Sequence, residues 1–164
     1  MQDFDDLLKA NRQYAAHFGL TGFDGIAHAG VAMVTCMDSR IDPLRMIGLE
    51  PGDAKILRNP GGRVTDAALV ALVLGVTMLH VNRILVVEHT RCAMASSTED
   101  ELKEKIGRSA GTDASWMTVG AIVDQESTVR ADVLRVRSHP LISDDVLVGG
   151  FLYDVDTGLL DTVV

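Results

Sequence analysis

The stretch AKILRNPGGRVTDAALVALVLGVTMLHVNRILVVEH, residues 54–89, decides the fold, because it predicts a strand, a helix and a second strand in succession. AKILRN (54–59) and RILVVEH (83–89) are short apolar runs of the kind that forms strands buried on both faces. Between them, Thr65 is a favourable helix N-cap, and Asp66 follows in the first turn, where the helix dipole favours a carboxylate. A strand, a crossover helix and a strand indicate a parallel sheet.

The segments on either side of this unit extend the same pattern. VAMVTC (31–36) predicts a further buried strand, and residues 3–17 have the apolar spacing of an amphipathic helix that packs on something else. TEDELKEKIG (98–107) and residues 118–137 predict two more helices, the second closed by Pro140. The predicted fold class is therefore α/β, with a mostly parallel central sheet flanked by helices.

The carboxyl-terminal segment, residues 146–164, predicts a strand, a turn at residues 156–158 and a final strand. These would form a hairpin at one side of the sheet. At 164 residues, of which 47% are hydrophobic and 23% charged, the chain has the size and composition of one domain spanning residues 1–164.

Composition also narrows the partners and the compartment. The formal net charge of −8 argues against binding to nucleic acid, since phosphate contacts depend on clustered Lys and Arg. The most apolar segment, residues 67–81, is shorter than the roughly 20 residues of a membrane-spanning helix. The acidic amino terminus has no pattern of a secretory leader, so we expect a cytoplasmic protein without a membrane partner that acts on a small molecule.

Two cysteines and a histidine form the first candidate site. Cys36 and His89 end two separate predicted strands, and ligands of open α/β sheets bind outside the carboxyl ends of strands. Because side chains alternate along extended backbone, Cys36, Asp38 and Arg40 can share one side of their segment. The spacing of His89 and Cys92 lets one turn bring both onto a metal. Two sulfurs and one nitrogen suit zinc, and three protein ligands leave its fourth position open for catalysis.

A glycine pair lies between these pieces, in LRNPGGRVTD (57–66). Gly61 and Gly62 let the backbone approach a bound group closely, and the helix that begins near Thr65 directs amide hydrogens and positive dipole toward an anion. We therefore expect Gly61 and Gly62 to bind a small anionic substrate near the metal. The alternative is an ordinary turn.

Three motifs together, CMDSR (36–40), RNPGGRVTD (58–66) and EHTRCAM (88–94), resemble those of the β-class carbonic anhydrases, in particular the short bacterial and archaeal members. The resemblance covers nearly the whole chain. It implies a zinc lyase, a carbonate dehydratase that interconverts carbon dioxide and bicarbonate through a hydroxide on the metal, and a homodimer or a larger assembly of dimers. By the same resemblance, Cys36, His89 and Cys92 are the zinc ligands, and Asp38 and Arg40 form the neighbouring catalytic dyad.

The chain departs from this pattern at three positions. Short members usually read HTDCGM where this chain reads HTRCAM, so Arg91 replaces an acid and Ala93 replaces a glycine. Pro60 stands where the family generally has alanine. We expect Ala93 to restrict the backbone and Arg91 to reverse a charge beside the site, which leaves the rate and the preferred substrate open.

Several alternatives follow from the same residues. A hydrolase of carbonyl sulfide or carbon disulfide would use the same scaffold and the same attack on a linear molecule. A zinc-binding homologue could keep the fold without turnover. A redox pair would join Cys36 and Cys92 in a disulfide when metal is absent. Each cysteine or histidine taken alone is also compatible with a purely structural role.

Overall fold

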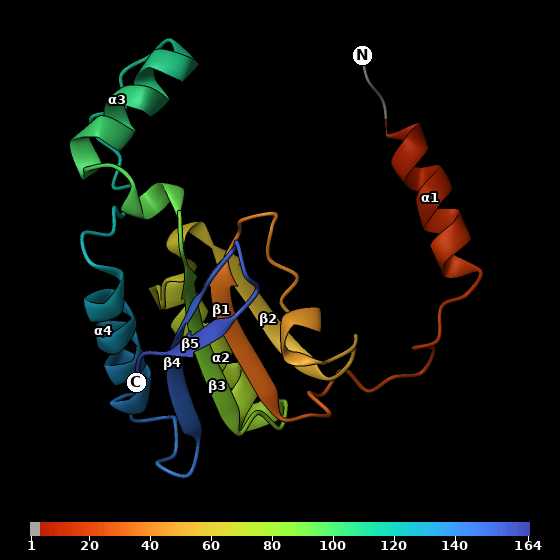
Figure 1. The fold of residues 1–164 in the computed structure, drawn as a ribbon. Coiled ribbons are helices and arrows are strands. Elements are labelled where there is room, and N and C mark those ends of the chain that lie inside the picture. Colours follow the sequence, from red (N-terminus) through yellow and green to blue (C-terminus); the bar gives the residue numbers. More distant parts are fainter. Residues whose placement is uncertain (1–3) are drawn as a thin grey trace.

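A computed structural model describes residues 4–164 and shows one five-stranded sheet with helices packed against it (Figure 1). The strand order is β2-β1-β3-β4-β5. The strands are β1 (Val31–Cys36), β2 (Ala54–Asn59), β3 (Arg83–His89), β4 (Leu147–Tyr153) and β5 (Leu160–Thr162). The α-helices are α1 (Asp5–Ala15), α2 (Asp66–Met78), α3 (Glu99–Ala110) and α4 (Gln125–Arg137), and the short 3-10 helices are η1 (Arg45–Ile47), η2 (Pro60–Gly62) and η3 (Ala93–Ala95).

The first four strands are parallel, as the strand-helix-strand pattern predicts. β1 lies in the middle between β2 and β3, and all six of its residues are buried. β2 lies at one edge of the sheet and is only half-buried. The expectation that β2 is buried on both faces is therefore wrong for a single chain. The carboxyl ends of β1 and β3 lie side by side because the two strands pair in parallel register, Thr35 beside Val87.

The helices α2 and α4 pack on the same face of the sheet and enclose the main apolar core. The predicted cap of α2 is confirmed, since the Thr65 side chain accepts a hydrogen bond from the Ala68 amide at 3.2 Å. The helix ends at Met78, within the apolar segment 67–81. Its end is set by His80, whose φ of +62° is incompatible with a continuing right-handed helix.

The predicted helix at 118–137 is wrong in its first seven residues, because α4 begins at Gln125. Asp124 caps it by accepting from the Ser127 amide at 2.6 Å. The preceding loop is held by Glu99 at the start of α3, whose carboxylate accepts from three successive amides, those of residues 119, 120 and 121, at 2.7, 2.9 and 2.9 Å. A helix beginning at residue 118 would leave these first amides unpaired in any case, so the late start of α4 has other causes. Gly120 has a φ of +86°, and the Ile122 amide donates to the Met94 carbonyl at 2.8 Å instead of to the carbonyl of residue 118.

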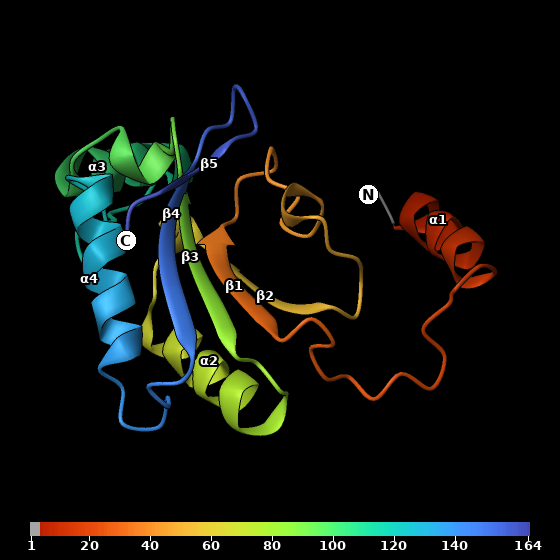
Figure 2. The same ribbon diagram turned by 60° about the horizontal axis from the view of Figure 1, so that its bottom comes forward.

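The two ends of the chain differ in how they meet the sheet. The carboxyl-terminal hairpin is confirmed: β5 pairs antiparallel with β4, and the Asp154 amide donates to the Leu159 carbonyl across the turn. The helix α1 confirms the prediction of a helix near the amino terminus, but it lies apart from the sheet (Figures 1 and 2), and none of its residues is buried. No helix within residues 4–164 is long and apolar enough to cross a membrane.

Candidate metal centre

The structure brings Cys36, His89 and Cys92 together at the carboxyl edge of the sheet. Cys36 ends β1 and His89 ends the neighbouring strand β3, while Cys92 follows one turn later, immediately before η3. Their ligand atoms all lie within 4.8 Å of one another, and all three residues are buried. The sequence prediction that these three side chains meet is therefore confirmed as geometry.

The imidazole of His89 is fixed in the orientation that a metal ligand needs. Its Nδ1 lies 2.8 Å from the Thr90 carbonyl oxygen, which accepts the ring N–H. Burial lowers the pKa of His89, although the contact with Thr90 acts in the opposite direction. In the neutral ring this leaves Nε2 as a lone-pair donor, and Nε2 is buried without a hydrogen-bond partner anywhere in residues 4–164. An orphaned buried nitrogen beside two sulfurs fits a bound metal ion.

The two thiols also favour a metal. Both cysteines are free and buried. Burial, with a smaller contribution from the nearby Cys36, raises the pKa of the Cys92 thiol to about 11. A cation among the three groups would reverse this effect, because a coordinating thiol is deprotonated outright. Two sulfurs and one imidazole nitrogen are the donor set that zinc accepts in sites with an open fourth position. The residues present therefore fit zinc.

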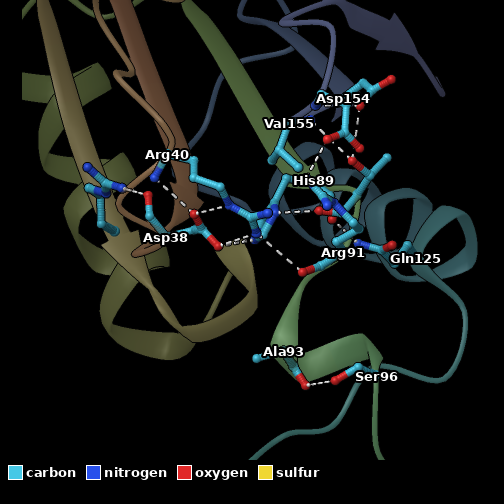
Figure 3. Close-up of polar contacts among 12 residues, drawn as sticks. Asp38, Arg40, His89, Arg91, Ala93, Ser96, Gln125, Asp154 and Val155 are labelled. Atoms are coloured by element: carbon cyan, nitrogen blue, oxygen red, sulfur yellow. Dashed lines mark hydrogen bonds and ion pairs between the residues drawn. The ribbon is translucent and has the colours of Figure 1, made fainter.

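Asp38 and Arg40 form a two-point ion pair beside His89 (Figure 3). Arg40 Nε donates to Asp38 Oδ1 at 2.9 Å, and Arg40 Nη2 donates to Asp38 Oδ2 at 2.7 Å. The Arg40 side chain, together with the Arg40 backbone amide, holds the pKa of the Asp38 carboxyl well below its usual range. Asp38 Oδ2 lies 3.9 Å from His89 Nε2, so a permanently ionised carboxylate faces the candidate metal position.

Arg58 supports the same segment from the edge strand β2, and sequence reasoning did not identify it. Its Nε donates to the Cys36 carbonyl at 3.0 Å, and its Nη2 donates to the Asp38 carbonyl at 2.6 Å. One planar guanidinium thus fixes the backbone on both sides of Met37. Arg58 reaches this segment because it is in register with Thr35, one residue before Cys36, and that register is set by the pairing of β1 with β2, which the sequence does not show.

Gly61 and Gly62 are buried behind the site, and both have a positive φ, 79° and 74°. A Cβ on Gly62 would lie 2.7 Å from the Val87 carbonyl oxygen and 2.9 Å from the Cys36 amide nitrogen. The close approach that Gly62 makes in the structure is to the ends of β1 and β3, whereas the sequence analysis expects an approach to a bound group. Binding of an anion by the glycine pair stays a prediction.

Of the two unusual residues in HTRCAM (89–94), Arg91 has a positive φ and Ala93 does not. Arg91 has a φ of +55°, whereas Ala93 begins η3 and has no positive φ. Ala93 thus adopts a backbone conformation that residues other than glycine readily take. The guanidinium of Arg91 makes an ion pair with Asp156 in the β4–β5 turn.

The residue immediately before His89 in the sequence, Glu88, carries a buried carboxyl. Glu88 is 0% exposed, and its Oε1 has no hydrogen-bond partner within the described residues. Gln125, the first residue of α4, donates to Glu88 Oε2 at 3.3 Å and to the His89 carbonyl at 2.8 Å. Burial raises the pKa of Glu88 to about 7. Neither residue was identified from the sequence, since a single Glu within a strand carries no signal of burial.

Comparison with known proteins places this geometry in context. A family model described as carbonic anhydrase matches residues 31–160. A "Beta-carbonic anhydrase 1" of Mycobacterium tuberculosis is 33% identical over 160 residues, which cover 97% of this chain and 96% of that protein. A crystal structure of carbonic anhydrase from Streptococcus mutans is 38% identical, with a TM-score of 0.89 over 100% of this chain and 99% of that one. A "Carbon disulfide hydrolase" of Acidithiobacillus thiooxidans is 28% identical and covers 82% of this chain and 73% of that protein.

Proposed function

Because this chain belongs to the β-class carbonic anhydrase family, we propose that it catalyses the zinc-dependent, reversible hydration of carbon dioxide to bicarbonate. The observation that carries the proposal is the buried cluster of Cys36, His89 and Cys92, whose ligand atoms lie within 4.8 Å of one another. These three residues would hold the zinc ion. When bound, zinc supplies Lewis-acid activation of water near neutral pH.

The neighbouring dyad has a separate task in this proposal. The two hydrogen bonds from Arg40 keep Asp38 ionised and fix the direction of its carboxylate. Asp38 Oδ2 faces the metal position and can accept a hydrogen bond from a water molecule that reacts there. Arg40 also holds the carboxylate back. Without Arg40, Asp38 would be free to turn and occupy the open position itself.

A stopped-flow carbon dioxide hydration assay tests the proposal directly. We expect the purified protein to carry about one zinc per chain and to accelerate hydration above the buffer rate. Removal of zinc with a chelator should abolish the acceleration, and readdition should restore it. A protein with a full complement of zinc and no rate above buffer would refute the proposed reaction while leaving the metal site intact.

A second candidate is hydrolysis of carbon disulfide or carbonyl sulfide. It is supported by relatives named carbon disulfide hydrolase that match most of this chain, one at 30% identity over 76% of it. The two functions are separated by measuring sulfide release from carbonyl sulfide and carbon disulfide beside carbon dioxide hydration on one preparation. A catalytically weak zinc-binding homologue would show full zinc content and neither activity. A redox pair would show a Cys36–Cys92 disulfide in place of zinc.

We propose further that the protein is a homodimer, or an assembly built from dimers, in the cytoplasm. The support for assembly is exposed apolar surface that this chain leaves uncovered. On α1, Leu7 and Tyr14 are 61% and 60% exposed, and on α2, Val70 and Met78 are 62% and 67% exposed. Multi-angle light scattering after size exclusion would show about twice the 17.6 kDa mass of one chain, or a multiple of it. A mass of one chain across micromolar concentrations would contradict the assembly.

A further inference from the structure

We infer that Arg91 is a positioning residue for the Asp38–Arg40 dyad, and that its ion pair with Asp156 couples the carboxyl-terminal hairpin to the site. This inference rests on the proposed function and adds a residue to it. We call the series Asp156, Arg91 and Arg40 the hairpin tether.

The first contact of the tether is between Arg91 and the dyad. Arg40 Nη2, which already donates to Asp38 Oδ2 at 2.7 Å, also lies 3.3 Å from the Arg91 carbonyl oxygen (Figure 3). The Arg91 carbonyl is therefore a second acceptor for the Arg40 nitrogen that holds Asp38. This carbonyl points toward Arg40 on a backbone with a φ of +55°, a conformation that residues other than glycine seldom adopt.

The second contact fixes the side chain of Arg91. Its Nη2 donates to Asp156 Oδ1 in the turn between β4 and β5. Because the guanidinium of Arg91 is held by Asp156, the backbone of Arg91 has less freedom to move. The carbonyl oxygen of this backbone is the one that Arg40 contacts. The negative charge of Asp156 also helps to raise the pKa of Arg40, after the larger effect of Asp38, so Asp156 acts on both arginines of the tether.

The turn that carries Asp156 is itself fixed to the site. The Thr90 amide donates to the Tyr153 carbonyl at 2.9 Å, and the Val155 amide donates to the Thr90 hydroxyl at 3.1 Å. The Asp156 amide donates to Asp154 Oδ1 at 2.8 Å. The turn and the 89–91 segment thus form one hydrogen-bonded unit, so the carboxylate of Asp156 is held where Arg91 can reach it.

The ion pair is solvent-exposed, with the side chains of Arg91 and Asp156 60% and 59% accessible, so its effect on overall stability is small. The effect of the ion pair on the dyad is measurable as a change in the hydration rate and in how firmly the Arg40 side chain is held. A charge exchange separates this role from a structural one. Arg91→Asp places two like charges together, and the added Asp156→Arg restores an opposite pair. Aspartate tolerates a positive φ better than most residues, so Arg91→Asp adds little backbone strain.

The experiment measures two quantities on the zinc-loaded full chain, the constants kcat and KM for hydration and the exchange rate of the Arg40 Nε–H proton by NMR. We expect Asp156→Asn and Arg91→Asp each to lower kcat by about two- to fivefold, the range of an exposed ion pair, with KM unchanged. The Arg40 Nε–H should exchange faster in both. The double variant Arg91→Asp/Asp156→Arg should restore both quantities, and the restoration should weaken at high salt.

The matched control is Glu104→Gln, which removes another exposed ion pair, with Arg108, on α3 away from the site. It should change neither kcat nor the exchange rate. The inference is overturned if Asp156→Asn and Arg91→Asp behave as this control does, or if the folded double variant restores neither quantity. The proton exchange decides the tether even if the wild-type chain hydrates no carbon dioxide, so failure of the proposed function is distinguishable from failure of this inference.

Discussion

The buried carboxyl of Glu88 should make the stability of this protein depend on pH in an unusual direction. Glu88 is 0% exposed, Gln125 is its one hydrogen-bond donor among residues 4–164, and burial raises its pKa from 4.5 to about 7. A carboxyl whose pKa is higher in the folded state stabilises the fold only while it is protonated. Its contribution is therefore complete below pH 4.5 and is lost as the pH rises to 7.

The size of the effect follows from the two pKa values. Each pH unit between 4.5 and 7 removes about 1.4 kcal/mol from the free energy of unfolding, so the total loss is about 3 kcal/mol. Glu88→Gln cannot ionise and keeps an oxygen that accepts from Gln125. Relative to the wild type, this variant should gain about 3 kcal/mol in unfolding free energy between pH 4.5 and pH 8.

The assay is equilibrium urea unfolding of both proteins at several pH values in a buffer that contains chelator, so that metal binding does not contribute to the difference. Glu88→Leu serves as the control, because any residue that cannot ionise must give the same pH-dependent part, whatever its packing costs. A difference between Glu88→Gln and wild type that is constant from pH 4.5 to 8 would refute the reasoning.

Three further predictions concern the dyad, the ligands and the glycine pair. Asp38→Ala and Arg40→Ala should each retain about one zinc per chain by elemental analysis. Each should lower the hydration rate by about 10- to 100-fold or more. Full activity in either variant would remove the dyad from the mechanism. Cys92→Ser should lose most of its zinc, together with the activity, and undiminished zinc content would exclude Cys92 as a ligand. Gly62→Ala should lower the free energy of unfolding by about 2–4 kcal/mol more than Gly111→Ala does. Both glycines have a positive φ, but only at Gly62 would an added Cβ meet backbone atoms. Equal losses in the two variants would contradict the close approach.

Much of the fold was predictable because local sequence and tertiary structure agree in its central part. The runs at residues 31–36, 54–59 and 83–89 are apolar and β-branched, and the structure has strands at those bounds. The cap at Thr65 depends on a contact three residues away, so it too can be inferred locally. The parallel arrangement then follows from the crossover helix.

The predictions from sequence are wrong where the local structure depends on residues far away in the chain. Residues 118–124 have the apolar spacing of a helix, but the Ile122 amide donates to the carbonyl of Met94, far from it in sequence, and Gly120 has a φ of +86°. Sequence periodicity cannot register a competitor of this kind. The half-buried state of β2 has a similar origin, since an apolar run does not reveal whether a strand lies at the centre or at the edge of a sheet.

The same distinction applies to the site. Cys36 and His89 could be placed together because both end strands that run in parallel, and Cys92 follows within one turn. Arg58, Gln125 and Asp156 could not, because each reaches the site through a contact with a residue far from it in sequence. Their contacts depend on the packing of whole elements, which no short motif encodes.

The central claim, that Cys36, His89 and Cys92 hold one zinc ion, is tested most directly by zinc K-edge X-ray absorption on the purified protein. We predict a four-coordinate shell with two sulfur neighbours at about 2.3 Å and two lighter neighbours, nitrogen or oxygen, at about 2.0–2.1 Å. A shell without sulfur, or a protein that binds no zinc while both thiols are reduced, would contradict it.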